Sequence, residues 1–429
     1  MPMHSSVVAG SAWQCIISVE DANSKGLHFL TTLDIELNSH AILGPDSALG
    51  VPVKLGALGL RRVGLVIDKT VAGQAAAQAL LEHWKAAGLE LTHYFEARTG
   101  LEPDYDYLDV VAAEFRGLEL DVIVGIGGGS TLDLAKGVAI LMRNPGPGIA
   151  YRGMNLVPVP GLPVVVVPTV AGSGSEVSST ASFIDLKTQT KLGINGRNVA
   201  ALFAVLDPVL LTACPASVTM GSALDAMVHA TEACTATTAN RISVLFGAEA
   251  MRLIFNALPA VIADATDRAA LGDLLLASTL AGLAMAHAAG GPASGISYPL
   301  GVHCGVPHGF AGGLLLPHIV AVNVGKGYAA GYAELYDRMQ LGGGGDTLMA
   351  LGKANFFRAR LLALHHQIGA PKDLLRWQVG SDSIEHLTNL TLAQRQGNLD
   401  LNPVRFERKA VAHVLAAAMG ITGDEYAGI

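Results

Sequence analysis

Three residues have the types and the spacing for binding a divalent metal. Asp225 and His229 are four residues apart in a run, residues 221–234, that lacks proline and has a helix-compatible pattern. On a helix, residues i and i+4 lie on one face, so a carboxylate oxygen and an imidazole nitrogen can converge there. Such mixed ligands suit Fe²⁺ or Zn²⁺, and His308 is the leading candidate for a third ligand. The alternative is an ordinary pair on a helix surface.

A run of glycines predicts a phosphate-binding turn. It consists of Gly127, Gly128, Gly129 and Ser130, between a strand-like run and a helical one that contains Asp133. Bare backbone N–H groups at the start of a helix bind phosphate, so we expect a nucleotide here. The alternative is a tight turn in which Ser130 caps the helix, which requires no ligand.

Two further stretches lie where a parallel sheet would bind a nucleotide. Asp68 ends a β-branched run, and a carboxylate there can accept from ribose hydroxyls and would repel a 2′-phosphate, favouring NAD over NADP. A second glycine-rich loop, residues 168–176, follows another such run and offers the hydroxyls of Thr169 and Ser173. A turn aspartate and a loop without a ligand are the alternatives.

The elements that must position these residues divide the chain into two parts. From residue 41 to 208, β-branched runs alternate with helical patterns, which predicts a doubly wound, mostly parallel α/β sheet. From 209 to 429 the apolar residues recur at helical spacing, which predicts an all-α domain for metal and substrate. Residues 1–40 are expected to be an N-terminal extension that packs on the first domain.

The composition limits the class of protein. Of 429 residues, 51% are apolar and 15% charged, the mean hydropathy is +0.42, and no apolar run reaches the roughly 18 residues of a membrane span. The net charge of −8 without basic clusters argues against nucleic acid or an anionic membrane as partner. The beginning of the chain lacks a secretory signal, and the four cysteines lack CxxC spacing. We therefore expect a cytoplasmic protein with much buried apolar surface, including subunit contacts.

Together these stretches resemble the iron-containing (group III) alcohol dehydrogenase family. The matching sequences run in the same order over about residues 41–420, and they are Gly127–Lys136, Pro168–Val177, Asp207–Pro208, Asp225–His229, Pro299–Gly301, Pro307–Gly309 and Asn402–Pro403. The resemblance implies a dinucleotide-binding α/β domain, a helical metal domain and a dimer or larger assembly. It also implies hydride transfer between a nicotinamide and a small alcohol, aldehyde or ketone.

The resemblance also assigns individual residues. It implies that Asp225, His229 and His308 bind Fe²⁺ or Zn²⁺. The residues that it places near NAD are Asp68, Gly127, Gly128, Gly129, Ser130, Asp133, Thr169, Ser173 and Lys191.

The chain departs from the family pattern at two positions. The family has His-x-x-x-His before its Pro-Leu-Gly sequence, one histidine for the metal and one near the nicotinamide, whereas this chain has Ser294 and Tyr298. A hydroxyl is a much poorer ligand for Fe²⁺ or Zn²⁺ than an imidazole. The three remaining ligands could hold the metal together with water, or His303 or His287 could replace the missing one.

A third interpretation is that metal is absent and that Tyr298 donates the proton to the substrate oxygen. The sequence thus predicts a metal-assisted reductase or dehydrogenase in which His308 and Tyr298 act at the reacting centre. Two rival hypotheses are a cyclase similar to dehydroquinate synthase, which uses NAD transiently, and a redox-silent NAD-binding protein.

Overall fold

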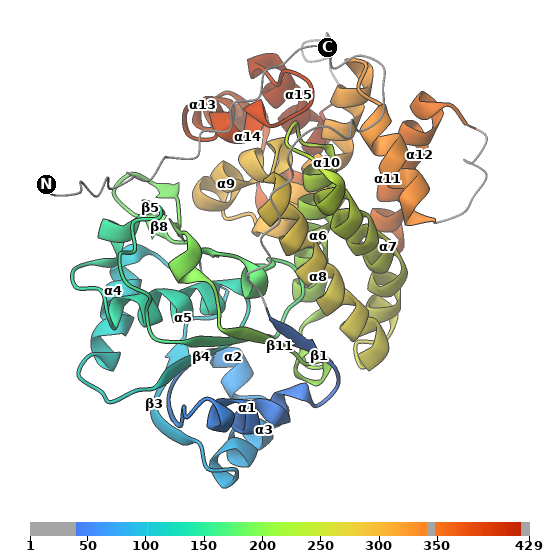
Figure 1. Ribbon diagram of the computed structural model, residues 1–429. Coiled ribbons are helices and arrows are strands. Elements are labelled where there is room, and N and C mark those ends of the chain that lie inside the picture. Colours follow the sequence, from blue (N-terminus) through green and yellow to red (C-terminus); the bar gives the residue numbers. More distant parts are fainter. Residues whose placement is uncertain (1–39, 101, 341–347, 422–429) are drawn as a thin grey trace, which may run out of the picture. The chain divides into compact units, whose positions relative to one another are not determined.

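The computed structural model describes residues 40–100, 102–340 and 348–421 (Figure 1). The expected N-terminal extension, residues 1–40, therefore lies outside the described residues except for His40. Its packing on the first domain stays a prediction, as do the domain boundaries.

Six parallel strands form the main sheet. They are β1 (Ala41–Leu43), β2 (Arg62–Asp68), β3 (Glu90–Ala97), β4 (Val122–Gly127), β6 (Val164–Pro168) and β11 (Phe203–Leu206). Their order in space is β1-β11-β6-β4-β2-β3, and every pair is parallel. The chain moves from β2 outward to β3 and then returns to the other side of β2, so the order reverses between β2 and β4. The doubly wound sheet predicted from the sequence is confirmed.

Helices cover both faces of this sheet. They are α1 (Val51–Ala57), α2 (Lys69–Ala72), α3 (Ala75–Ala86), α4 (Tyr105–Phe115) and α5 (Gly129–Leu141). Alternate side chains of a strand point to opposite faces. Leu65 of β2 accordingly packs in the cluster that contains residues of α1 and α3, and its neighbour Val66 packs in the one that contains residues of α4 and α5. The second cluster continues into the helical half of the chain.

Short strands outside the main sheet were not predicted. A three-stranded sheet has the order β5 (Gly153–Met154), β10 (Ile194–Asn195) and β7 (Thr180–Ala181), and β8 (Ile184–Asp185) pairs with β9 (Thr190–Lys191). Strands of two residues show no alternation in sequence, which is why the period-2 pattern did not reveal them. They matter for the site because β9 carries Lys191.

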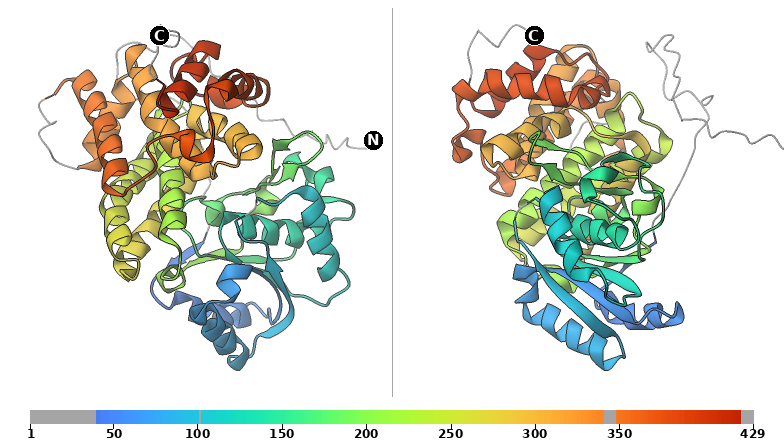
Figure 2. Two further views of the ribbon diagram at one scale, coloured as in Figure 1. Left: turned by 180° about the vertical axis from the view of Figure 1, so that it is seen from behind. Right: turned by 90° about the vertical axis from the view of Figure 1, so that its left-hand side faces the viewer.

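The second half is helical throughout its described part, as predicted. Its helices are α6 (Ala216–Thr235), α7 (Arg241–Ala263), α8 (Arg268–Ala288), α9 (Pro292–Cys304), α10 (His308–Gly325), α11 (Ala330–Met339), α12 (Ala350–Gln367), α13 (Ile384–Gln394), α14 (Gln396–Asp400) and α15 (Arg408–Ala418). The helices α6, α7 and α8 pack side by side, with α10 against α6 (Figures 1 and 2).

Three of these helices, α7, α8 and α10, are long and apolar enough to cross a membrane by length and composition. The buried share of the most apolar segment is 56% in α7, 56% in α8 and 67% in α10. More than half of each segment thus packs inside the protein, which accounts for much of the high mean hydropathy.

Candidate active site

The three stretches predicted to bind NAD lie at the carboxyl ends of neighbouring strands. Asp68 ends β2, Gly127 ends β4, and Thr169 follows β6, and these strands are adjacent in the sheet. The backbone N–H of Thr169 donates to the carbonyl of Gly127 at 2.9 Å. Ligands of open α/β folds bind outside the carboxyl ends of the strands, where the strand order reverses. That reversal lies between β2 and β4.

The first glycine turn is tighter than the sequence suggested. Gly127 has a φ of +156°, and a Cβ there would lie 2.7 Å from Cβ of Thr131. Gly128 is the N-cap and α5 begins at Gly129, so the alternative in which Ser130 caps the helix is wrong. The first N–H groups of a helix have no intrahelical acceptor, and those of α5 lie at a partly exposed edge, which suits a phosphate.

The two glycine loops pack directly against each other. A Cβ on Gly129 would lie 2.5 Å from Oγ of Ser173, so only glycine fits at this position. Asp133 of α5 accepts from the Ser175 hydroxyl at 2.6 Å and from the backbone N–H of Ser182 at 2.9 Å. Both of its carboxylate oxygens are therefore used in holding the second loop. Direct contact of Asp133 with the cofactor stays a prediction.

A buried lysine of α5 fixes the same loop. The Lys136 ammonium lies within 3.2 Å of oxygens of Ser175, Ser178 and Thr180. Its distance to the Asp133 carboxylate is 3.9 Å. Burial lowers the pKa of Lys136. Since these oxygens occupy its donors, Lys136 is a structural residue of the site.

The Asp68 carboxylate caps a helix and faces the glycine turn. Its Oδ1 accepts from the N–H groups of Thr70 and Val71 at 2.8 and 3.2 Å and from the Thr99 hydroxyl at 2.8 Å. The turn-aspartate alternative is therefore correct for this oxygen. Oδ2 accepts no hydrogen bond within the described part of the chain, and a Cβ on Gly127 would lie 3.0 Å from Cβ of Asp68. Oδ2 thus remains available for a ribose hydroxyl.

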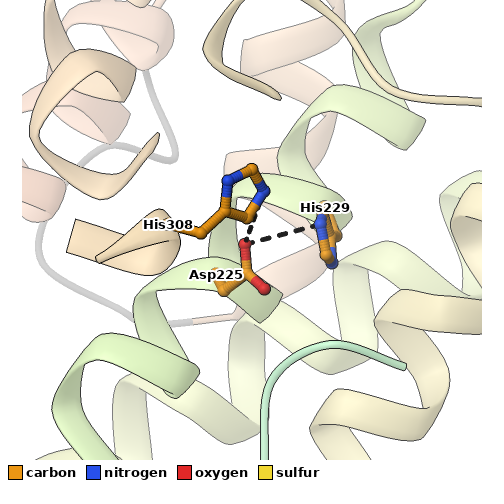
Figure 3. Close-up of side chains that lie close together, drawn as sticks. All are labelled: Asp225, His229 and His308. Carbon is orange, nitrogen blue, oxygen red and sulfur yellow. Dashed lines mark ion pairs between the residues drawn. The ribbon is translucent and has the colours of Figure 1, made fainter. Parts of the chain in front are cut away.

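The three predicted metal ligands converge in the helical half (Figure 3). Oδ1 of Asp225 lies 3.5 Å from Nε2 of His229 and 3.8 Å from Nε2 of His308, and all three donor atoms lie within 4.8 Å of one another. Donors of a tetrahedral zinc site with bonds of 2.0–2.1 Å would be about 3.3 Å apart, which is close to the two distances from the Asp225 oxygen to the imidazoles. Burial lowers the pKa of His308, which favours the neutral imidazole that a metal requires.

A close helix contact brings His308 to this cluster. The helix α10 begins at His308, directly after Pro307. A Cβ on the next residue, Gly309, would lie 1.9 Å from the carbonyl oxygen of Gly221 in α6. Any larger residue would therefore separate α10 from α6, which explains the Pro-His-Gly sequence. The Ser297 hydroxyl lies 3.2 Å from Nδ1 of His308 and orients the ring so that Nε2 faces Asp225.

The Ser294 side chain is hydrogen-bonded to a buried carboxylate. Its hydroxyl donates to Oε2 of Glu232 at 2.5 Å, and the N–H groups of Gly291 and Ala293 donate to the same carboxylate at 2.7 and 2.6 Å. Glu232 thus caps the N-terminus of α9, and burial raises its pKa. The serine that stands at the family's ligand position belongs to this cap. No sequence pattern indicated Glu232, which lies 62 residues from Ser294.

Tyr298 lies beside His308, with ring centroids 4.8 Å apart. Two cations face its ring: the Arg395 guanidinium carbon lies 3.9 Å and the Lys191 ammonium 5.5 Å from the centroid. Lys191 is paired with Glu102 at 2.7 Å. Although burial opposes the effect, Glu102 raises the pKa of Lys191 and Lys191 lowers that of Glu102. Sequence reasoning missed Glu102 and Arg395.

The two substitute histidines lie elsewhere. The His303 ring packs edge-on against His386, with centroids 5.7 Å apart, and His287 packs near Phe246. Neither belongs to the cluster, which is the one group of possible metal ligands found in the described residues. The suggestion that His303 or His287 replaces the missing ligand is wrong. One carboxylate and two imidazoles suit Fe²⁺, and catalytic zinc also uses three protein ligands and an open position.

Comparison with protein families gives two matches. The description "Iron-containing alcohol dehydrogenase" matches residues 38–208, and "Fe-containing alcohol dehydrogenase family, C-terminal" matches residues 219–419. The 1,3-propanediol dehydrogenase of Klebsiella pneumoniae is 30% identical over 87% of this chain and 96% of its own length. A sulfoacetaldehyde reductase of Bilophila wadsworthia is 34% identical over 60% of this chain and 66% of its own length.

Solved structures agree with this assignment. A 1,3-propanediol oxidoreductase is 28% identical, with a TM-score of 0.84 over 91% of this chain and all of that one. The sulfoacetaldehyde reductase of Bifidobacterium kashiwanohense, solved with NAD⁺, shares the fold, with a TM-score of 0.79 at 23% identity over 90% of this chain and 99% of its own. The chain therefore belongs to the iron-containing alcohol dehydrogenase family and is an oxidoreductase of that family.

Proposed function

We propose that this protein is an NAD-dependent, metal-assisted reductase of small aldehydes or ketones, which also works in the direction of alcohol oxidation. The observation that carries the proposal is the convergence of Asp225, His229 and His308, since three such donors leave an open position for a substrate oxygen. When bound, the metal polarises that oxygen as a Lewis acid.

The cofactor loops support NAD as the hydride carrier. In this proposal the pyrophosphate binds to the N–H groups at the start of α5, beside Ser130 and Ser173. Oδ2 of Asp68 accepts from a ribose hydroxyl, and its negative charge disfavours the 2′-phosphate of NADP. Thr169 and Lys191 lie at the nicotinamide end.

Tyr298 is proposed as the proton donor. Its ring packs against His308, and its hydroxyl forms no hydrogen bond with other described residues, so the O–H is available to the substrate. As the carbonyl carbon receives hydride, the phenol proton moves to the carbonyl oxygen and solvent restores it. The cations Lys191 and Arg395 beside the ring would stabilise the phenolate that remains.

The first test is elemental analysis of protein purified without chelator or affinity metal, beside a chelator-treated sample, together with an NADH oxidation assay on a panel of aldehydes. About one equivalent of Fe or Zn and chelator-sensitive turnover are expected. Turnover that survives complete metal removal would transfer the chemistry to Tyr298 alone. Cofactor binding without net NADH oxidation would contradict a reductase and favour a cyclase or a redox-silent protein.

The same protein preparation tests the state of assembly. We propose that the protein assembles as a homodimer, because its apolar composition provides surface for subunit contacts. We also propose that it is cytoplasmic, because its four cysteines lack the spacing of a disulfide framework. Light scattering coupled to size exclusion would measure the mass, and a mass of one 44.3 kDa chain would refute the dimer.

A further inference from the structure

The active site contains one cation that lacks a carboxylate partner. Lys191 is neutralised by Glu102 at 2.7 Å, and the nearby Arg152 is neutralised by Asp185 at 2.7 Å. Arg395 forms no ion pair with any carboxylate of the described chain. Its Nη2 donates to the backbone carbonyl of Lys191 at 2.6 Å, and its Nε is buried without an acceptor there.

The position of this guanidinium is built into the fold. Arg395 lies between α13 and α14, and this segment packs closely on α9 at Gly295. A Cβ on Gly295 would lie 2.9 Å from Cβ of Asn398 and 3.6 Å from Cβ of Arg395. The close approach places the guanidinium carbon 3.9 Å from the centre of the Tyr298 ring. Arg395 therefore contacts the ring of Tyr298, the proposed proton donor, and Tyr298 in turn contacts the metal ligand His308.

A half-buried arginine with an unused N–H group is costly unless an anion joins it. Its planar guanidinium binds a carboxylate or sulfonate through two parallel hydrogen bonds. Packing against Tyr298 does not remove this requirement, because a ring face attracts the charge without accepting hydrogen bonds from the in-plane N–H groups.

We infer that Arg395 recognises an acidic group of the substrate. The inference rests on the proposed reductase function and narrows its substrate class to short aldehydes that carry a carboxylate or a sulfonate. The carbonyl lies at the metal ligands and Tyr298, and the acidic group lies at Arg395 beside the tyrosine ring. In this inference Arg395 selects the substrate through its acidic group, in addition to stabilising the Tyr298 phenolate.

The test compares two four-carbon aldehydes, succinic semialdehyde and butanal, which differ by a terminal carboxylate. The native enzyme is expected to prefer succinic semialdehyde in kcat/KM by about 10-fold or more, mainly through KM. Arg395→Gln removes the charge beside Tyr298 and should slow both aldehydes, but it should lower kcat/KM for succinic semialdehyde by about 10-fold or more beyond its effect on butanal, so that the preference is lost. Arg395→Lys keeps the charge without the fork and should lie between the two.

The matched control is Arg408→Gln, which removes an exposed arginine of α15 and should leave the preference unchanged. A native preference for butanal, or an unchanged preference in Arg395→Gln, would overturn the inference. Weaker NADH binding in Arg395→Gln with an unchanged preference would assign the arginine to the cofactor instead and would also overturn it.

A binding measurement separates this inference from the proposed function. Calorimetric titration of the NADH complex with succinate requires no turnover. If neither aldehyde oxidises NADH, the reductase proposal fails. Succinate that binds the native protein and binds Arg395→Gln at least about 10-fold more weakly would still support acid recognition, and equal binding to both would refute it.

Discussion

The two walls of the proposed active site carry different side chains. One presents a carboxylate and two imidazoles, and the other presents hydroxyls and cations. On one wall, α6 and the start of α10 keep a carboxylate and two imidazoles directed at one point, and Gly309 allows the helices to approach. On the other wall, α9 has Ser294 and Tyr298 at the two positions where the resemblance led us to expect histidines. The Ser294 hydroxyl is hydrogen-bonded to Glu232, and the Tyr298 ring contacts His308 and two cations. In the proposed mechanism one wall holds the metal, and the other supplies the proton and the positive charge beside it.

The largest effect is expected on the metal wall. Asp225→Ala removes the oxygen that both histidines face, so bound metal should be lost and kcat/KM should fall by at least about 100-fold. Elemental analysis and NADH oxidation measure the two effects. Full metal content and activity in this variant would show that the donor cluster is only an ion pair. The control is Asp273→Ala, at an exposed aspartate of α8.

The α9 wall should respond differently. Tyr298→Phe keeps the ring between His308 and Arg395 and removes only the hydroxyl. We expect kcat to fall by about 100-fold, while metal content and the Kd for NADH stay unchanged. Stopped-flow turnover and NADH fluorescence titration test this split. Equal rates for the variant and the native enzyme would exclude Tyr298 as the proton donor. A loss of metal would show that Tyr298 also supports metal binding.

Low pH is expected to lower the stability of a third region, and this effect is distinct from any effect of pH on the active site. Burial lowers the pKa of His318 in α10 and of His365 in α12 to about 4, and the unfolded value is near 6.5. The unfolded chain therefore takes up protons first, so stability is full above pH 6.5 and is lost as the pH falls towards 4, by up to about 3 kcal/mol for His365. Thermal unfolding at pH 7.5 and pH 5 measures the loss.

The variant His365→Leu should flatten this pH dependence, whereas His83→Gln, at an exposed histidine, should leave it unchanged. If His365→Leu retained the full acid-induced drop in Tm, the buried histidine would not be its source.

The smallest effect is expected at Ser294. Ser294→Ala removes one hydrogen bond to Glu232 and leaves the backbone donors in place, so unfolding should become easier by about 1–2 kcal/mol. Metal content should not change, because the serine serves the helix cap. Denaturant unfolding measures the first effect, with the exposed Ser381→Ala as the control. Loss of metal without loss of stability would show that Ser294 serves the metal site and not the helix cap.

The sequence predicted the fold better than the connections within it. The strands β2, β4 and β6 coincide with the β-branched runs read from the sequence, because such runs contrast with the helical patterns around them. The edge strand β1 and its neighbour β11 were missed because three or four residues show no clear alternation. The glycines of the first turn were read as a phosphate site, but packing against Ser173 and Thr131 also requires them.

The site divides in the same way. Asp225 and His229 could be predicted from helical spacing alone, whereas His308 was a candidate third ligand that the family resemblance supported. Arg395 could not be found, since it meets Tyr298 only after α14 packs on Gly295, and nothing near residue 395 in the sequence indicates that approach. Contacts between segments far apart in sequence follow from tertiary packing and leave no local periodicity.

The second glycine loop has a mechanical consequence for the whole reaction. Gly174 touches α8 so closely that a Cβ on it would lie 2.6 Å from Cα of Gly282, and Glu176 accepts from Thr279 of the same helix at 3.1 Å. The other side of this loop is fastened to α5 by Asp133 and Lys136. Any rotation of the helical half relative to the sheet must therefore move this loop with it. In the proposed function the loop lines the NAD site, so NADH release and access of the substrate are expected to change together in one motion.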